Sequence, residues 1–163
     1  MRRLFIALAL VALVGGVMAA PVAATTTRIP TACAESLITD WTIPRQWVDE
    51  NLVYHVRGET ATYRLTGDAY CAGTNEPSVD VNVDLTTGQG NVVAKGHIVL
   101  DAFDGGWDGT LVAHLTPGGP YLWVGTFVAN GFGELAGWQW RSDLVEVTHL
   151  LVLDDGFVFQ PGS

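Results

Sequence analysis

The sequence has few positive charges. It contains eight Lys and Arg against 17 Asp and Glu, with a formal net charge of −9. Two of the eight, Arg2 and Arg3, belong to a segment that we expect to be removed, which leaves six basic residues against 17 acidic ones, a net charge of −11. Such a surface repels phosphate backbones and anionic lipids, so we expect no nucleic-acid partner and no polybasic attachment to membranes.

Long apolar runs are also scarce. The run from Leu4 to Val14 is too short to span a bilayer comfortably. It follows two arginines and precedes small residues, which is the three-part pattern of a secretory signal. We predict a signal peptide over residues 1–24 with cleavage after Ala24, and cleavage after Ala19 is the alternative. The processed protein is then secreted, extracellular or periplasmic, with no membrane partner.

Cysteine is limited to Cys33 and Cys71. In an oxidising compartment, an even pair in a small secreted domain is most simply a structural disulfide. The chain-entropy argument assigns such a bridge roughly 4 kcal/mol of stabilisation. A redox or metal role would need closely spaced cysteines, and the sequence has no Cys-x-x-Cys.

The usual catalytic signatures are missing. The sequence has no G-x-S-x-G, no H-E-x-x-H, no phosphate loop and no dinucleotide fingerprint. No two histidines have the spacing of a zinc motif, so we expect no cofactor and no catalytic metal. One acidic loop, with Asp101, Asp104 and Asp108, is a candidate for calcium, but Asp and Gly are also the ordinary residues of a turn.

What the sequence does have is alternation. From Val79 to Thr86, apolar and polar residues alternate strictly, as in a half-buried antiparallel strand. Turn sequences rich in Gly, Asp and Pro separate this run from other runs of strand composition. The further predicted strands are Leu52–Arg57, Ala61–Gly67, Asn91–Asp101, Trp107–Thr116, Pro120–Asn130, Ala136–Ser142 and Leu144–Asp154.

Residues 25–51 lack this pattern. We interpret them as an N-terminal lead in which Ala34–Ile38 has some helical character, ended by Pro44, which removes a backbone donor. The strand domain is predicted to span residues 52–163.

About eight strands joined by tight turns need protection of their edges. Closure into a single antiparallel up-and-down β-barrel removes them, and a β-sandwich is the alternative. Glycines inside the strands, such as Gly96 and Gly125, favour the barrel because they allow sharp bending. We therefore predict an all-β fold, most simply a barrel.

The glycine pattern of the second half resembles a known family. Gly106–Thr110, Gly125–Phe127 and Asn130–Gly137 are similar to the glycine-rich elements of small secreted, calycin-type barrels related to allene oxide cyclase. In that group a G-x-G-x-[FL]-x-G element marks a turn into a late barrel strand. The resemblance covers about a third of the chain. It implies a fold and assigns no catalytic residue.

Aromatic residues are the candidates for ligand binding. Tyr121, Trp123 and Phe127 share one face of a predicted strand, and Trp138 and Trp140 share one face of the next. At a barrel mouth they would stack on an apolar or aromatic ligand. The alternative is that they fill the barrel as core residues.

Two titratable residues are the catalytic candidates. His149 shares the apolar face of its predicted strand, so it is placed to act as a base or a ligand contact if the barrel is hollow, or as a core histidine if not. Glu134 is the second candidate, and Glu134 with Glu146 would form an acid and base pair if they were close.

These observations predict a secreted barrel that binds a small apolar or aromatic ligand and is not primarily an enzyme. The first alternative is an isomerase or cyclase that shapes a reactive substrate inside the barrel, with His149 or Glu134 assisting proton transfer. The second alternative is a filled structural or surface-interaction protein. The oligomeric state is left open. Fold alone does not decide among these functions.

Overall fold

The computed structural model describes residues 27–39, 41–115, 117, 122–147 and 150–160. The predicted signal peptide therefore lies outside the described residues. Within them the chain forms eleven strands and no helix. In chain order they are β1 (Arg28–Leu37), β2 (Arg45–Val48), β3 (Val53–Thr60), β4 (Tyr63–Gly67), β5 (Gly73–Asn75), β6 (Ser78–Asp84), β7 (Gly90–Leu100), β8 (Gly105–Leu115), β9 (Trp123–Gly133), β10 (Gln139–Val147) and β11 (Leu150–Phe159).

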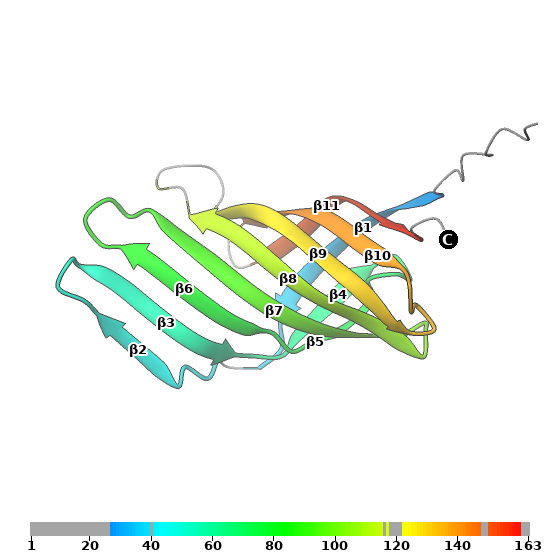
Figure 1. Cartoon of the computed structure of the whole chain (residues 1–163), viewed down its shortest axis with the longest axis horizontal. Helices are drawn as coiled ribbons and strands as arrows, with labels where there is room; N and C mark the ends of the chain where they lie inside the picture. The colour runs from blue at the N-terminus through cyan, green and yellow to red at the C-terminus, as the bar shows by residue number, and fades with distance from the viewer. Residues whose placement is uncertain (1–26, 40, 116, 118–121, 148–149, 161–163) are drawn as a thin grey trace, which may run out of the picture.

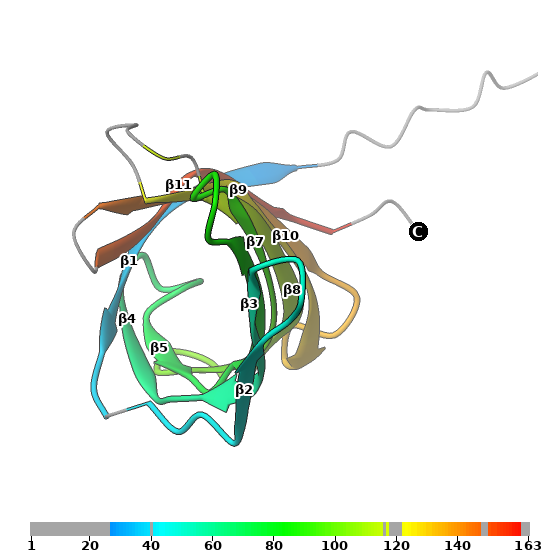
Figure 2. The ribbon, with the colours of Figure 1, turned by 90° about the vertical axis from the view of Figure 1, so that its left-hand side faces the viewer.

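Eight of these strands close into a barrel. The order β7-β5-β4-β1-β11-β10-β9-β8 returns to β7 through a β7–β8 pairing, and every pairing is antiparallel. Figure 2 shows the ring end-on. The prediction of an antiparallel barrel is confirmed and the sandwich alternative is wrong. Pairing of the first strand with the last, β1 with β11, completes the closure and leaves neither edge open.

The sheet forks at β7. The end of β7 pairs with β5, whereas its beginning pairs with β6 along the same edge. Beyond β6 the sheet continues into β3 and β2, so these three extra strands extend the wall at one end of the barrel (Figure 1). The link from β1 to β2 is tied to this extension, because Thr42 and Thr60 form a two-way backbone bridge.

The prediction for residues 25–51 was wrong. The barrel begins at Arg28, and Ala34 and its neighbours lie in β1 with no helical turn. In β1 the side chains of Ile29, Thr31, Cys33 and Glu35 point inward, alternating with more exposed residues. Two of these four inward residues are polar. The strand therefore lacks the continuous apolar face by which a half-buried strand is recognised in a sequence.

A predicted strand break at Asp143 was also wrong. β10 continues through this residue, pairing Asp143 with Thr126 of β9. The irregularity lies instead in β11, which has one extra residue relative to both of its neighbours. The register shifts opposite Thr31–Cys33 of β1 and opposite Arg141–Asp143 of β10.

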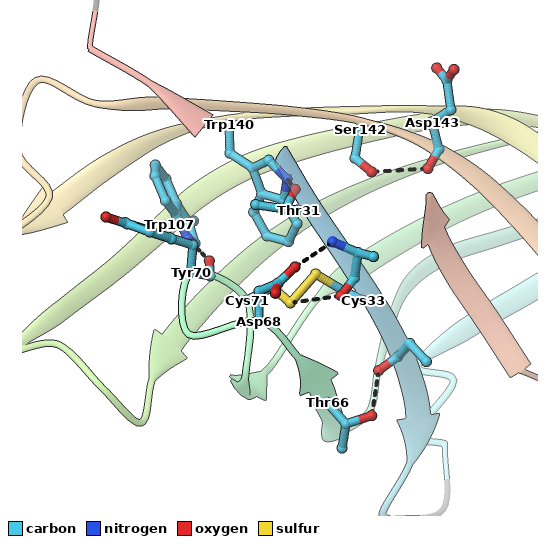
Figure 3. Close-up of a disulfide and its surroundings, with 12 residues drawn as sticks. Thr31, Cys33, Thr66, Asp68, Tyr70, Cys71, Trp107, Trp140, Ser142 and Asp143 are labelled. Atoms are coloured by element: carbon cyan, nitrogen blue, oxygen red, sulfur yellow. Dashed lines mark hydrogen bonds between the residues drawn. A yellow bond between two sulfur atoms is a disulfide. The ribbon is translucent and has the colours of Figure 1, made fainter. Parts of the chain in front are cut away.

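One half of the barrel is filled by aromatic side chains. Trp107 and Trp140 are fully buried with their ring centroids 5.8 Å apart, and Phe127 meets Trp140 edge-on at 5.0 Å. Both indole N–H groups are satisfied: Trp107 donates to the Tyr70 carbonyl over 2.7 Å, and Trp140 donates to Thr31 Oγ1 over 3.1 Å (Figure 3). This packing makes a solid plug at one end.

Cys33 and Cys71 form the predicted disulfide. It joins β1 to the turn after β4, and both half-cystines are buried in the core (Figure 3). The same turn is held a second time by Asp68, whose carboxylate accepts a 2.7 Å hydrogen bond from the Ala32 amide. A disulfide of this kind is compatible with an extracellular location. In the described part of the chain, no helix is long and apolar enough to cross a membrane.

Candidate functional site

The other half of the barrel contains a cavity of about 340 Å³. Its floor is formed by core side chains that include Leu65, Ile98 and Phe127. The extension strands β3 and β6 supply a further wall, and the link between β1 and β2 contributes Trp41 and Ile43. Most lining residues are apolar. The polar and acidic ones are Glu35, Tyr54, Glu59, Tyr63, Asn75 and Glu146.

Glu35 is the most deeply buried acid in the cavity. The residue is 6 % exposed, and its Oε1 accepts a 2.6 Å hydrogen bond from Asn75 Nδ2. Burial raises the pKa of Glu35 to about 7, and the hydrogen bond from Asn75 opposes that rise. Glu35 is therefore able to hold or release a proton near neutral pH.

Within the described part of the chain, the side-chain amide of Asn75 forms a hydrogen bond through its nitrogen but none through its oxygen. The residue is 8 % exposed, and its Oδ1 accepts no hydrogen bond from any described residue. Gly96 of β7 makes room for this oxygen, since a Cβ at position 96 would lie 2.9 Å from Asn75 Oδ1. A buried amide oxygen without a donor is unusual in proteins.

Glu59 enters the cavity through a β-bulge. Opposite β6, Val56 pairs with Val81 but Glu59 pairs with Val79, so two residues of β3 face one of β6. Gly58 adopts a φ of +67° in this bulge, and its amide donates to Asp80 Oδ1 over 2.9 Å. The extra residue turns Glu59 inward, on the same side as Val56.

The acidic residues gather around Tyr63 on β4. Burial raises the pKa of the Tyr63 phenol, and the charges of Glu35, Glu59 and Glu146 raise it further. Burial likewise raises the pKa of Glu59. Both effects have the same cause, because an apolar cavity penalises every negative charge placed in it.

The structure brings only some of the predicted aromatic residues to the cavity. Trp123 and Phe127 line it, as expected from their shared face on β9. Trp140 instead belongs to the filled core, and Trp138 packs on Tyr70 at a centroid distance of 6.0 Å, away from the cavity lining. Tyr121 lies outside the described residues.

The predicted catalytic residues are not brought together in the cavity. Glu134 is exposed in the turn between β9 and β10, where its Oε2 accepts from the Asp104 amide over 3.0 Å. Glu146, near the opposite end of β10, does line the cavity, so the two glutamates cannot act as a pair. His149 lies outside the described residues.

The three aspartates of the calcium hypothesis have separate roles. Asp101 binds Arg64, with Nη1 3.0 Å from Oδ1, and this partner lowers the pKa of Asp101. Asp108 lies 2.7 Å from His97 Nδ1, and Asp104 is an exposed loop residue. Over the described ranges, no three His, Cys, Asp or Glu side chains are grouped as a metal ion would require.

Sequence reasoning missed Glu35, Glu59 and Asn75. For Glu35 a signal was present, because a residue two positions after an inward half-cystine in a strand shares its face. Glu59 had none, since simple alternation from Val56 places position 59 outside. Asn75 lies in a strand of three residues, too short for its alternation to be recognised.

Comparison with models of protein families found no match for this chain, and searches of curated proteins and of solved structures found none. The resemblance to the allene oxide cyclase-like barrels therefore stays a prediction. Function has to be inferred from the cavity and its residues.

Proposed function

We propose that this protein is exported and binds a small apolar or aromatic molecule in the barrel cavity. The observation that carries the proposal is the cavity of about 340 Å³ between an aromatic plug and the extension strands. Protein interiors are normally close-packed, so an apolar space of this size needs a reason to persist. Ligand sites typically occupy roughly 300–1,000 Å³, with apolar walls and a few polar groups.

The first test is native mass spectrometry of the mature protein purified from a secreting host. The native spectrum is compared with that of the same sample after denaturation. A non-covalent mass that is released on denaturation supports the proposal. The denatured mass also identifies the N-terminus, so a start at Thr25 or Ala20 supports export, and retention of residues 1–24 contradicts it.

A pair of variants tests the location of binding. Ala94 faces the cavity, whereas its neighbour Val93 is 37 % exposed on the outer face of the same strand. We expect Ala94→Phe to weaken binding of 2-(1-naphthyl)ethanol, a neutral aromatic probe, at least tenfold by occupying the space. Val93→Phe adds a similar ring outside and should bind within twofold of wild type. Equal affinities in the two variants would contradict binding in the cavity.

A second candidate function is favoured by Glu35. An isomerase or cyclase needs a titratable group inside the cavity, and the pKa of Glu35 is raised to about 7 by burial. This group would replace Glu134, which lies outside the cavity. The discriminating measurement is product analysis of the released ligand after incubation with wild-type protein and with Glu35→Gln. Conversion by wild type alone would support catalysis, and recovery of unchanged ligand would support simple binding.

A further inference from the structure

The described residues that line the cavity offer hydrogen-bond acceptors but no positively charged donor. Of the described residues that line it, none is Lys, Arg or His, while three are glutamates. A carboxylate-bearing ligand would therefore meet only negative charge. A ligand that donates hydrogen bonds would meet complementary groups.

The buried pair of Glu35 and Asn75 defines the most specific acceptor site. Asn75 Nδ2 donates to Glu35 Oε1 over 2.6 Å, whereas its Oδ1 accepts from no described residue, although Asn75 is only 8 % exposed. A pair that served only to join β1 to β5 would not need an unpaired oxygen in the wall of a cavity. A buried carbonyl oxygen beside a carboxylate matches the several N–H donors of one ammonium group.

Two further carboxylates line the same cavity. Glu59 from β3 and Glu146 from β10 line the same space, so negative charge approaches it from three different strands. All three glutamates line the cavity that Tyr63 also lines, and the charge of each raises the pKa of Tyr63. A cation is the ligand charge that a cavity lined by carboxylates favours. The aromatic side chains of Trp41 and Trp123 in the lining also favour a cation over an anion.

We propose, on the basis of the proposed ligand-binding function, that the cavity selects small organic amines, with the ammonium group on Glu35 and Asn75 Oδ1 and the apolar or aromatic body against the remaining wall. Primary amines fit best because they carry three donors for acceptors that lie close together.

The test uses three probes that share one aromatic body and differ in charge. These are 2-(1-naphthyl)ethylamine, 2-(1-naphthyl)ethanol and 1-naphthylacetic acid, titrated into the mature protein by calorimetry at pH 8. We expect the amine to bind at least tenfold more tightly than the alcohol, and the acid to bind most weakly. Binding of the alcohol or the acid as tightly as the amine would overturn the inference while leaving the proposed function in place. If none of the three binds, both are overturned.

Two variants locate the selectivity. Glu35→Gln keeps the size and the acceptor for Asn75 but removes the charge, so amine affinity should fall about tenfold while alcohol affinity changes less than twofold. Glu134→Gln removes the same charge from an exposed turn outside the cavity and should change neither. Equal losses for amine and alcohol in Glu35→Gln, or an amine loss of the same size in Glu134→Gln, would overturn the assignment to Glu35.

Discussion

Asn75 Nδ2 donates a 2.6 Å hydrogen bond to Glu35 Oε1 over the intervening strand β4. On β4, Glu35 pairs with Leu65 and Asn75 pairs with Tyr63, so the bond runs diagonally across this strand. One neutral donor compensates only part of the desolvation of a buried carboxylate. This relationship explains why the pKa of Glu35 is raised to about 7 in spite of the bond.

The first prediction concerns the pH dependence of stability. Because folding raises the pKa of Glu35 from 4.5 to about 7, its contribution is fully present below pH 4.5 and is lost as the pH rises to 7. Glu35→Gln removes this loss. We expect the variant to be similar in stability to wild type at pH 4 and more stable at pH 8 by up to roughly 3 kcal/mol, measured by urea unfolding.

The difference between the two proteins isolates Glu35 from other titrating groups. Glu59, Glu146 and Tyr63 face the same cavity and are present in both proteins. The aspartates whose pKa values are lowered, such as Asp101, stabilise the fold as the pH rises through the acid range, again in both. A stability difference that does not change between pH 4 and pH 8 would contradict the prediction.

The second prediction concerns the disulfide. Replacing both Cys33 and Cys71 by alanine should lower the free energy of unfolding by roughly 2–4 kcal/mol, because the bridge closes a loop of 38 residues. Wild-type protein in dithiothreitol should lose a similar amount, whereas the double variant should be insensitive to the reagent. Equal stability of wild-type protein in oxidising and reducing buffer would rule out a stabilising bridge.

The third prediction compares two tryptophans. Trp107 is fully buried and donates to the Tyr70 carbonyl, so Trp107→Phe leaves both a void and an unpaired oxygen. We expect a loss of about 2–3 kcal/mol in chemical denaturation. Trp138 is only partly buried at the edge of the same cluster, and Trp138→Phe should lose less than about 1 kcal/mol. A reversed order would mean that the plug is not centred on Trp107.

Strand alternation predicted most of the barrel because most of its strands have one apolar and one polar face. The strictest alternation, that of Val79, Val81 and Val83, lies in the extension strand β6, which pairs with the barrel strand β7. The disulfide was predicted from the cysteine count and the expected oxidising compartment. β1 was missed because its inward face includes Thr31 and Glu35. Those two polar residues are there for tertiary reasons, since Thr31 accepts from Trp140 and Glu35 faces the cavity.

The cavity was harder to predict than the barrel. Trp123 and Phe127 were identified from their shared face, but an aromatic residue has the same pattern whether it lines a cavity or fills a core. Trp140 shows the second case. The acidic groups depend on which strands meet across the barrel, and that information lies in pairings such as β1 with β4, which neighbouring residues do not encode.

The last prediction tests how Glu59 reaches the cavity. Gly58 holds the bulge of β3 at a φ of +67°, where an L side chain costs about 1 kcal/mol. In Gly58→Ala we expect that loss of stability together with return of β3 to regular alternation, which turns Glu59 outward. Carboxyl NMR should then find the pKa of Glu59 lowered to the ordinary range, since solvent replaces the apolar surroundings.

Gly137→Ala is the matched control, because Gly137 also has a positive φ, of +85°, and a Cβ there meets nothing within 4 Å. The control should lose a similar amount of stability and leave the pKa of Glu59 raised. A raised pKa in both variants would show that the bulge persists without glycine and that pairing with β6 is what holds Glu59 inward.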